Sequence, residues 1–139
     1  MKVPTDLKIL GFIYDHYYET FAAYSKEKPT RNTKIYVPID VDMIGKHFSV
    51  DGDIIFGSLY YHLNHKFGYT NDKGHIIRIF TTELIGQPMG KDINVVNFPY
   101  LASVLADLRR ERSRYRWAIG VSVLSLIISL YALWFSKGG

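Results

Sequence analysis

Cysteine is absent from this chain of 139 residues. Without a thiol, the chain can form neither a disulfide nor a thiolate metal site, and it suits a reducing cytoplasm. HExxH, GxSxG and a glycine-rich phosphate loop are absent too. The segment GQPMGKD, residues 86–92, has only a superficial likeness to such a loop, because its spacing differs. We therefore expect a non-enzymatic protein with no catalytic residues and no cofactor.

A metal site is not expected either. His62 and His65 stand three positions apart, so on a helix they could face the same ligand. A metal site needs further ligands, and no acidic residue or cysteine lies next to this pair. The sequence therefore predicts two exposed polar side chains.

Acidic residues are nearly absent from the last quarter of the chain. Residues 1–108 hold eleven Lys or Arg and twelve Asp or Glu, a net charge of −1. Residues 109–139 hold six Lys or Arg against Glu111 alone, a net charge of +5. The overall charge of +4 therefore does not indicate a basic, nucleic-acid-binding domain. Five of these cations form one block: Arg109, Arg110, Arg112, Arg114 and Arg116.

The longest uncharged segment follows this arginine block. Residues 117–135, WAIGVSVLSLIISLYALWF, contain no charged side chain. As a helix they would extend roughly 28 Å, close to the ~30 Å hydrocarbon core of a bilayer. Trp117 at one end, with Tyr131 and Trp134 at the other, fit the two interfacial aromatic belts. The sequence predicts a transmembrane helix; the alternative is a buried core helix.

The arginine block also predicts an orientation. Five Arg lie before the apolar segment and only Lys137 lies after it, so we expect residues 1–116 in the cytoplasm. The N-terminus has no long apolar region typical of a secretory signal. We expect a tail-anchored, single-pass protein of a cytoplasmic (inner) membrane, of bacterial or phage origin, with residues 136–139 as a short exterior tail.

Small side chains recur along the apolar segment at spacings of four, three, four and three residues. Small residues let membrane helices approach closely, and serine can hydrogen-bond across the contact. This seam predicts self-association of the helix; chance composition is the alternative. The seam consists of Ala118, Ser122, Ser125, Ser129 and Ala132.

The residues before the arginine block predict an α+β domain. An apolar stripe from Leu7 to Tyr24 favours a first helix capped by Thr5 or Asp6, and residues 34–39 form a short β-prone run. Asp40 can cap a second helix over 41–48. A third helix is expected over 52–67, where apolar residues recur every four positions.

A hairpin and a long helix complete the predicted order. Residues 69–70 and 75–80 read as strands around an Asn-Asp-Lys-Gly turn. Asn97 and Pro99 then begin a helix without a breaker before residue 135. We divide the chain into a domain (1–85), a connector (86–97), an arginine-rich juxtamembrane helix (98–116) and the transmembrane helix (117–135).

Residues 39–80, IDVDMIGKHFSVDGDIIFGSLYYHLNHKFGYTNDKGHIIRIF, resemble a winged helix-turn-helix domain in their order of elements. The resemblance covers about residues 5–80 and rests on element order, not on a diagnostic motif. It implies that the third helix and the hairpin form the contact surface for DNA or for a protein. Carried over to this chain, the contact residues are Ser58, Tyr61, His62, His65, Lys73, His75 and Arg78.

The third helix departs from that of a DNA reader. It carries no Arg and only one Lys, Lys66, while Asp51 and Asp53 lie at its start, where they would repel phosphate. This favours binding of a protein partner or signal over DNA. The other expected partners, membrane lipid and further copies of the chain, follow from the predicted transmembrane helix. Two alternatives stay open: a membrane-tethered DNA-binding regulator, and a pore-forming effector of a phage-defence or toxin system.

Overall fold

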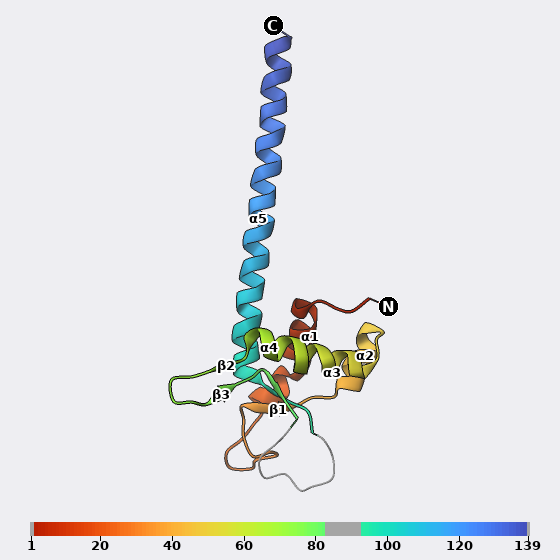
Figure 1. Ribbon diagram of the computed structural model, residues 1–139, viewed down its shortest axis with the longest axis vertical. Helices are drawn as coiled ribbons and strands as arrows, with labels where there is room; N and C mark the ends of the chain where they lie inside the picture. The colour runs from red at the N-terminus through yellow and green to blue at the C-terminus, as the bar shows by residue number, and fades with distance from the viewer. Residues whose placement is uncertain (1, 83–92, 139) are drawn as a thin grey trace. The chain divides into compact units, whose positions relative to one another are not determined.

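The computed structural model of this protein describes residues 2–82 and 93–138. The fold is α+β, with a small N-terminal domain followed by a long C-terminal helix, as predicted. Two compact units divide the chain, Met1–Leu105 and Ala106–Gly139. Of the predicted connector, residues 86–97, the segment GQPMGKD, residues 86–92, lies outside the described residues. The elements in chain order (Figure 1) are α1 (Asp6–Ala22), β1 (Tyr36–Pro38), α2 (Val41–Phe48), α3 (Gly52–Gly57), η1 (Ser58–Leu63), α4 (Asn64–Phe67), β2 (Tyr69–Thr70), β3 (Ile76–Ile77), β4 (Phe80–Thr81), β5 (Val95–Asn97) and α5 (Phe98–Lys137).

Helix α1 begins at a side-chain cap. Thr5 Oγ1 accepts a hydrogen bond from the Lys8 N–H at 3.3 Å, which satisfies one free donor of the first turn. The fully buried residues are Ile9, Leu10 and Ile13, so of the predicted stripe only Leu10 belongs to this innermost face. The helix ends at Ala22, and Tyr24, predicted as the last member of the stripe, lies beyond it.

Helices α2 and α3 are joined by a turn of three residues. Asp40 caps α2, as predicted, by accepting from the N–H groups of Asp42 and Met43. Ser49 adopts a left-handed conformation, with φ of 57°, and ends the helix. Gly52 begins α3 against α2, because a Cβ at this position would lie 2.0 Å from Asp42 Oδ1. The packing of α3 on α2 therefore leaves no room for a side chain at this position.

The predicted third helix, residues 52–67, is continuous but not uniformly α-helical. Its middle turn, η1, is a π-helix, in which the hydrogen bonds run from residue i to i+5. Ile55, Leu59 and Leu63, spaced by four in the sequence, all lie fully buried and form the inner side of this helix.

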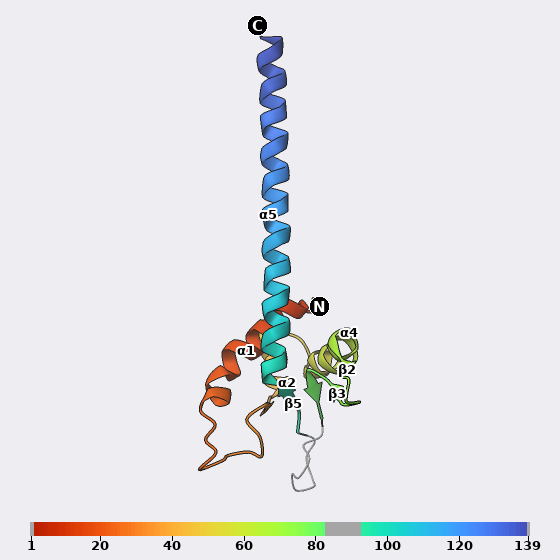
Figure 2. The same cartoon turned by 90° about the vertical axis from the view of Figure 1, so that its left-hand side faces the viewer.

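The strands form two separate antiparallel sheets. The three-stranded sheet has the order β1-β5-β4, with Val37 opposite Val96 and Phe80 opposite the same Val96. The second sheet is the hairpin β2-β3, with Thr70 opposite Ile76. The hairpin extends from the end of α4 in both views (Figures 1 and 2).

Two sequence-based expectations differ from this topology. Residues 75–80 were predicted as one strand, but they divide between β3 in the hairpin and β4 in the larger sheet. Strand β5 was not predicted, because residues 86–97 read as a connector, yet it is the central strand. A strand of three residues is stabilised by its partners and leaves little local signal.

The core of the first unit lies between the larger sheet, α1 and the start of α5. Phe98 is almost completely buried, and its ring stacks on Phe21 at 4.7 Å and on Tyr14 at 5.4 Å between centroids. Leu101, Val104 and Leu105 continue this buried face along α5. Each fully buried side chain of this size contributes about 1.5–3 kcal/mol. The first turns of α5 are therefore part of the N-terminal domain.

Helix α5 is long and apolar enough to cross a membrane. It begins where the Asn97 Oδ1 accepts from the Tyr100 N–H at 3.2 Å, and it runs without a break to Lys137, as predicted. Its most apolar window of 18 residues has a mean hydropathy of 2.1, and none of that window is buried inside the chain. Within the described residues, this apolar segment is therefore not a buried core helix, which was the alternative interpretation of the sequence.

Candidate partner-binding surface

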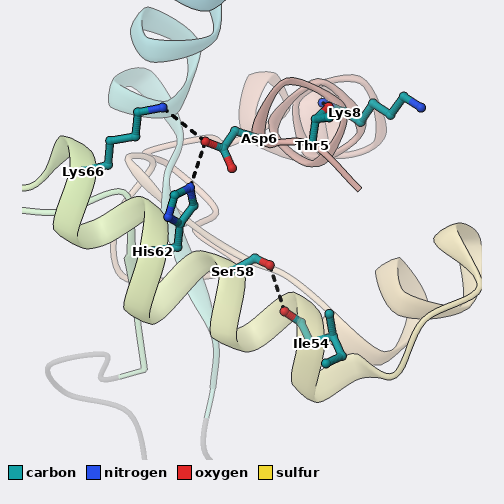
Figure 3. A network of polar contacts seen from close by, with 7 residues as sticks. All are labelled: Thr5, Asp6, Lys8, Ile54, Ser58, His62 and Lys66. Atoms are coloured by element: carbon teal, nitrogen blue, oxygen red, sulfur yellow. Dashed lines mark hydrogen bonds and ion pairs between the residues drawn. The ribbon is translucent and has the colours of Figure 1, made fainter. Parts of the chain in front are cut away.

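Two residues of the third helix, Ser58 and Tyr61, differ in their availability to a partner. The Ser58 hydroxyl donates to the Ile54 carbonyl at 3.0 Å and is partly buried, so it is engaged within its own helix (Figure 3). Tyr61 is 71% exposed, and its ring meets Tyr60 edge-on at 5.0 Å. Of these two predicted contact residues, Tyr61 is the one that the fold presents to solvent.

His62 takes part in a polar cluster with α1. Its Nε2 lies 3.0 Å from Asp6 Oδ2, and Lys66 Nζ lies 3.5 Å from the same oxygen (Figure 3). The His62 and Asp6 side chains are 57% and 23% exposed, so the pair is partly screened by solvent and contributes about 0–1 kcal/mol. The Lys8 side chain points away from this cluster (Figure 3). The cluster joins the start of α1 to the third helix.

Sequence reasoning found no acidic partner beside His62, whereas the structure brings Asp6 to it from 56 positions away. Such a long-range pairing leaves no local signal. Within residues 2–82 and 93–138, no group of three His, Asp or Glu side chains could hold a metal ion. His65, one turn before the hairpin, is exposed.

We refer to the hairpin with the residue that follows it, residues 69–78, as the wing. Its turn is ordered by Asn71, whose Oδ1 accepts from the N–H groups of Lys73 at 3.0 Å and His75 at 2.9 Å. Gly74 has φ of +82°, a conformation that glycine adopts without strain. The predicted contact residues Lys73, His75 and Arg78 are all exposed here. The turn thus holds these side chains on an ordered frame.

Sequence reasoning missed two exposed side chains of the wing, Tyr69 and Ile76, which are 52% and 62% exposed. The adjacent isoleucines of HIIR, residues 75–78, must point to opposite sides of an extended strand, but the sequence does not show which of them is exposed. Tyr69 lies at the base of the wing, with its ring 5.9 Å from that of Tyr100. The Tyr100 hydroxyl donates to the Phe67 carbonyl, which fixes the start of the wing to α5. Burial, with a smaller contribution from Tyr69, raises the pKa of Tyr100.

The two ends of the third helix carry opposite charge. At its start, Asp51 caps the helix by accepting from the Asp53 N–H at 2.8 Å. At its end and on the wing, Lys66, Lys73 and Arg78 outnumber Asp72. The wing therefore attracts anionic groups more strongly than the helix start does.

The arginine block and the small-residue seam both lie on α5. All five arginines are exposed, and Arg110 pairs with Asp107 at 3.5 Å. The hydroxyls of Ser122, Ser125 and Ser129 each donate at 2.9 Å to the carbonyl four residues before. Each of these donors is therefore satisfied within the helix itself. Ala118 and Ala132 complete the seam and are exposed within the chain.

Comparisons of this chain with protein-family models, with curated proteins and with solved structures found no match.

Proposed function

We propose that this chain is a non-enzymatic, single-pass membrane protein whose N-terminal domain binds a protein partner. The observation that carries the proposal is the apolar window of α5, which has a mean hydropathy of 2.1 and no buried residue. Such a surface is stable in hydrocarbon and unfavourable in water. The flanking arginines and the aromatic residues at both ends of the segment support the same placement.

Extraction of cell membranes tests the anchor. The full chain should stay in the membrane pellet at alkaline pH, and detergent should release it. Leu126→Arg with Ile127→Arg places two charges near the centre of the segment, each costing about 2.5–3.5 kcal/mol, and should shift the chain to the soluble or aggregated fraction. Ser136→Arg, at the end of the segment, is the matched control and should leave the pellet unchanged. Release of the unmodified chain by alkali would refute the anchor.

The absence of cysteine gives a direct test of the proposed orientation. In intact cells, a membrane-impermeant thiol reagent should label Ser136→Cys, because this position follows the apolar segment. Lys2→Cys should react only after lysis, because the positive-inside rule keeps the arginine-flanked side in the cytoplasm. The reverse labelling pattern would contradict the proposed topology.

The partner-binding role follows from the winged-helix-like order of α1, β1, α2, α3 and the β2-β3 hairpin. A protein partner is favoured over DNA because Lys66 is paired with Asp6 and the helix start carries Asp51 and Asp53. The exposed Tyr61 supports the same choice, since tyrosine is enriched at protein interfaces. In this proposal, the small-residue seam of α5 brings copies of the chain together.

DNA binding is the second candidate function, favoured by the three-residue turn between α2 and α3. A gel shift with the full chain in detergent separates the two. A regulator should bind duplex DNA at low salt and lose that binding as salt rises. No shift at low salt would exclude it.

A pore-forming effector is the third candidate, in which the seam serines would line a channel. These serines donate to their own helix at 2.9 Å but keep lone pairs free to face water. Induced expression should then depolarise the membrane. Normal growth with an intact membrane potential would count against this role.

A further inference from the structure

The guanidinium groups of the arginine block are largely unused by the chain itself. Arg110 pairs with Asp107 at 3.5 Å, but both side chains are 70% exposed, so water screens this pair. The other four arginines make no ion pair and no side-chain hydrogen bond within residues 2–82 and 93–138. All five side chains are exposed. The block therefore offers free cationic donors to a partner.

These donors are spread around the helix. The whole block lies in the unbroken helix α5, so each residue turns the direction of its side chain by about 100°. Arg109, Arg112 and Arg116 follow at spacings of three and four and share one side. Arg110 and Arg114, four positions apart, lie on a different side. A protein segment docked on one side of α5 would leave one of these sets uncovered, whereas a layer of lipid surrounds the helix and reaches both.

The depth of the block in a membrane follows from the helix rise. Arg116 directly precedes Trp117, the first residue of the apolar segment. At 1.5 Å per residue, the positions from 116 back to 112 lie within about 8 Å of that boundary. The headgroup layer of a bilayer is roughly 5–8 Å thick on each side. With the apolar segment in hydrocarbon, these arginines therefore lie among the lipid headgroups, and the long side chains of the remaining two extend toward the same layer.

The block is made of arginine alone. Between residues 106 and 136 the chain has no lysine, although the positive-inside rule counts lysine and arginine alike. Orientation therefore does not require this choice of residue. A guanidinium differs from an ammonium because its planar fork donates two parallel hydrogen bonds to a phosphate. The composition thus favours an occupant that carries phosphate oxygens.

We propose that the arginine block binds the phosphates of anionic phospholipids through its guanidinium groups and enriches these lipids around α5 in the leaflet on the arginine side. This inference rests on the proposed membrane anchor. It adds the class of lipid that the anchor selects and the residues that select it.

The two tryptophans of the chain allow a test at each end of the apolar segment. Trp117 lies beside the arginine block and Trp134 lies near the opposite end, and they are 76% and 73% exposed. Trp134→Phe leaves only Trp117 to report on the arginine side, and Trp117→Phe leaves only Trp134. Each full-length variant is reconstituted into vesicles with equal amounts of phosphatidylcholine and phosphatidylglycerol, of which one lipid at a time carries bromine, a contact quencher, on its acyl chains.

We expect phosphatidylglycerol to be enriched about twofold to fivefold over phosphatidylcholine at Trp117, and to show little enrichment at Trp134. Because both leaflets have the same composition, Trp134 is an internal control that does not depend on the orientation of the chain. The enrichment at Trp117 should fall as salt rises, since salt screens exposed charges.

Substitutions in the Trp117-only chain separate charge from guanidinium chemistry. Replacing Arg112, Arg114 and Arg116 by Gln should bring the enrichment close to one. Replacing the same three by Lys keeps the charge but removes the fork, and should leave clearly less enrichment than arginine does. The matched control removes three exposed cations of the N-terminal domain and should leave the enrichment unchanged: Lys26→Gln, Lys28→Gln and Lys73→Gln.

Several outcomes would overturn the inference. These are equal quenching of Trp117 by the two lipids, equal enrichment at Trp117 and Trp134, or full enrichment in the Gln or Lys variant. Loss of the enrichment on addition of a soluble glutamate peptide would assign the block to an acidic protein instead. Alkaline extraction tests the anchor separately, so a chain that resists extraction but shows no enrichment disproves lipid selection alone.

Discussion

Asn64 makes hydrogen bonds to both backbone polar groups of Phe80. Its Nδ2 donates to the Phe80 carbonyl at 2.7 Å, and its Oδ1 accepts from the Phe80 N–H at 2.9 Å. One helix side chain thereby takes the place of a neighbouring strand beside β4. The contact links the third helix to the larger sheet.

Loss of this clamp should destabilise the N-terminal domain. Asn64→Ala leaves two partly buried backbone groups without partners, and we expect the free energy of unfolding to fall by about 1–3 kcal/mol. Denaturant unfolding of the full chain in detergent, with hydrogen exchange at the Phe80 amide, measures the effect. His65→Ala, at the exposed neighbouring residue, should change stability by less than about 0.5 kcal/mol. Equal effects of the two substitutions would show that the clamp contributes nothing.

Two glycines of α3 should respond in opposite ways to alanine. A Cβ at Gly52 would lie 2.0 Å from Asp42 Oδ1 and 3.0 Å from Asp42 Cα. Gly52→Ala must therefore displace the Asp42 carboxylate and shift the α2 backbone by a few tenths of an ångström, at a cost of about 1–3 kcal/mol. At Gly57 the nearest atom, in the flexible ring of Tyr61, is 3.9 Å away, so Gly57→Ala should stabilise the helix by about 0.5–1 kcal/mol.

Thermal unfolding of the two alanine variants in parallel gives the comparison. The midpoint should fall for Gly52→Ala and rise for Gly57→Ala. A fall of similar size in both would mean that the close approach of Asp42 to Gly52 does not determine the packing of α2 on α3.

Strong alkali should weaken the attachment of the wing to α5. Burial raises the pKa of Tyr100 above the tyrosine value of about 10, so the unfolded chain loses this proton at a lower pH than the folded chain does. The stabilising contribution is fully present below about pH 10 and is lost as pH rises through the folded pKa. The ionised oxygen can no longer donate to the Phe67 carbonyl.

Unfolding free energies measured from about pH 8 to above pH 10 check this expectation. Tyr100→Phe should be less stable than the unmodified chain near neutrality, by about 0.5–1.5 kcal/mol, and should lose less stability in alkali. Tyr17, whose pKa is also raised, chiefly by burial, remains in the variant and accounts for part of the residual slope. Identical alkaline slopes for both chains would contradict the assignment to Tyr100.

We expect self-association through the small-residue seam to depend on the small size of its side chains and not on the hydrogen bonds of its serines. Because Ser125 and Ser129 already donate within their own helix, Ser125→Ala with Ser129→Ala should preserve self-association. Ser125→Leu with Ser129→Leu should abolish it, because the larger side chains keep the helices apart. Crosslinking in membranes measures both variants. Oligomers that survive the leucine changes would refute the seam, and oligomers lost with alanine would assign the contact to interhelical hydrogen bonds.

Local signals predicted most of the helices and the turn of the wing. Asp40 before an apolar face identified α2 to the residue, and Asn97 with Pro99 identified the start of α5. What could not be predicted depends on residues far apart in the chain. The pairing of Val37 with Val96 creates β5, and the approach of Asp6 to His62 determines which polar residues of the third helix are engaged.

The π-helical turn was predicted in part: its apolar stripe was visible in the sequence, but its wider backbone geometry was not. Spacing of Ile55, Leu59 and Leu63 by four was visible as an apolar stripe, but a regular α-helix accounts for such a stripe almost as well. The wider turn is distinguished by its backbone hydrogen bonds, such as that from the Asn64 N–H to the Leu59 carbonyl five residues before, which leave no local signal in the sequence. The hydrogen bond from the Ser58 hydroxyl to the Ile54 carbonyl could not be predicted from the sequence either, because a serine hydroxyl can bind water as readily as a backbone carbonyl.

In the proposed membrane-spanning arrangement, the serine hydroxyls of α5 have a consequence for how the chain inserts into a bilayer. Ser122, Ser125 and Ser129 bring no unsatisfied donor into hydrocarbon, because each hydroxyl is bound by a carbonyl of its own helix. A helix of this kind can insert as a single copy, with no partner required during biogenesis. Any association then follows insertion and obeys mass action in two dimensions, so the amount of protein per area of lipid determines the assembled fraction.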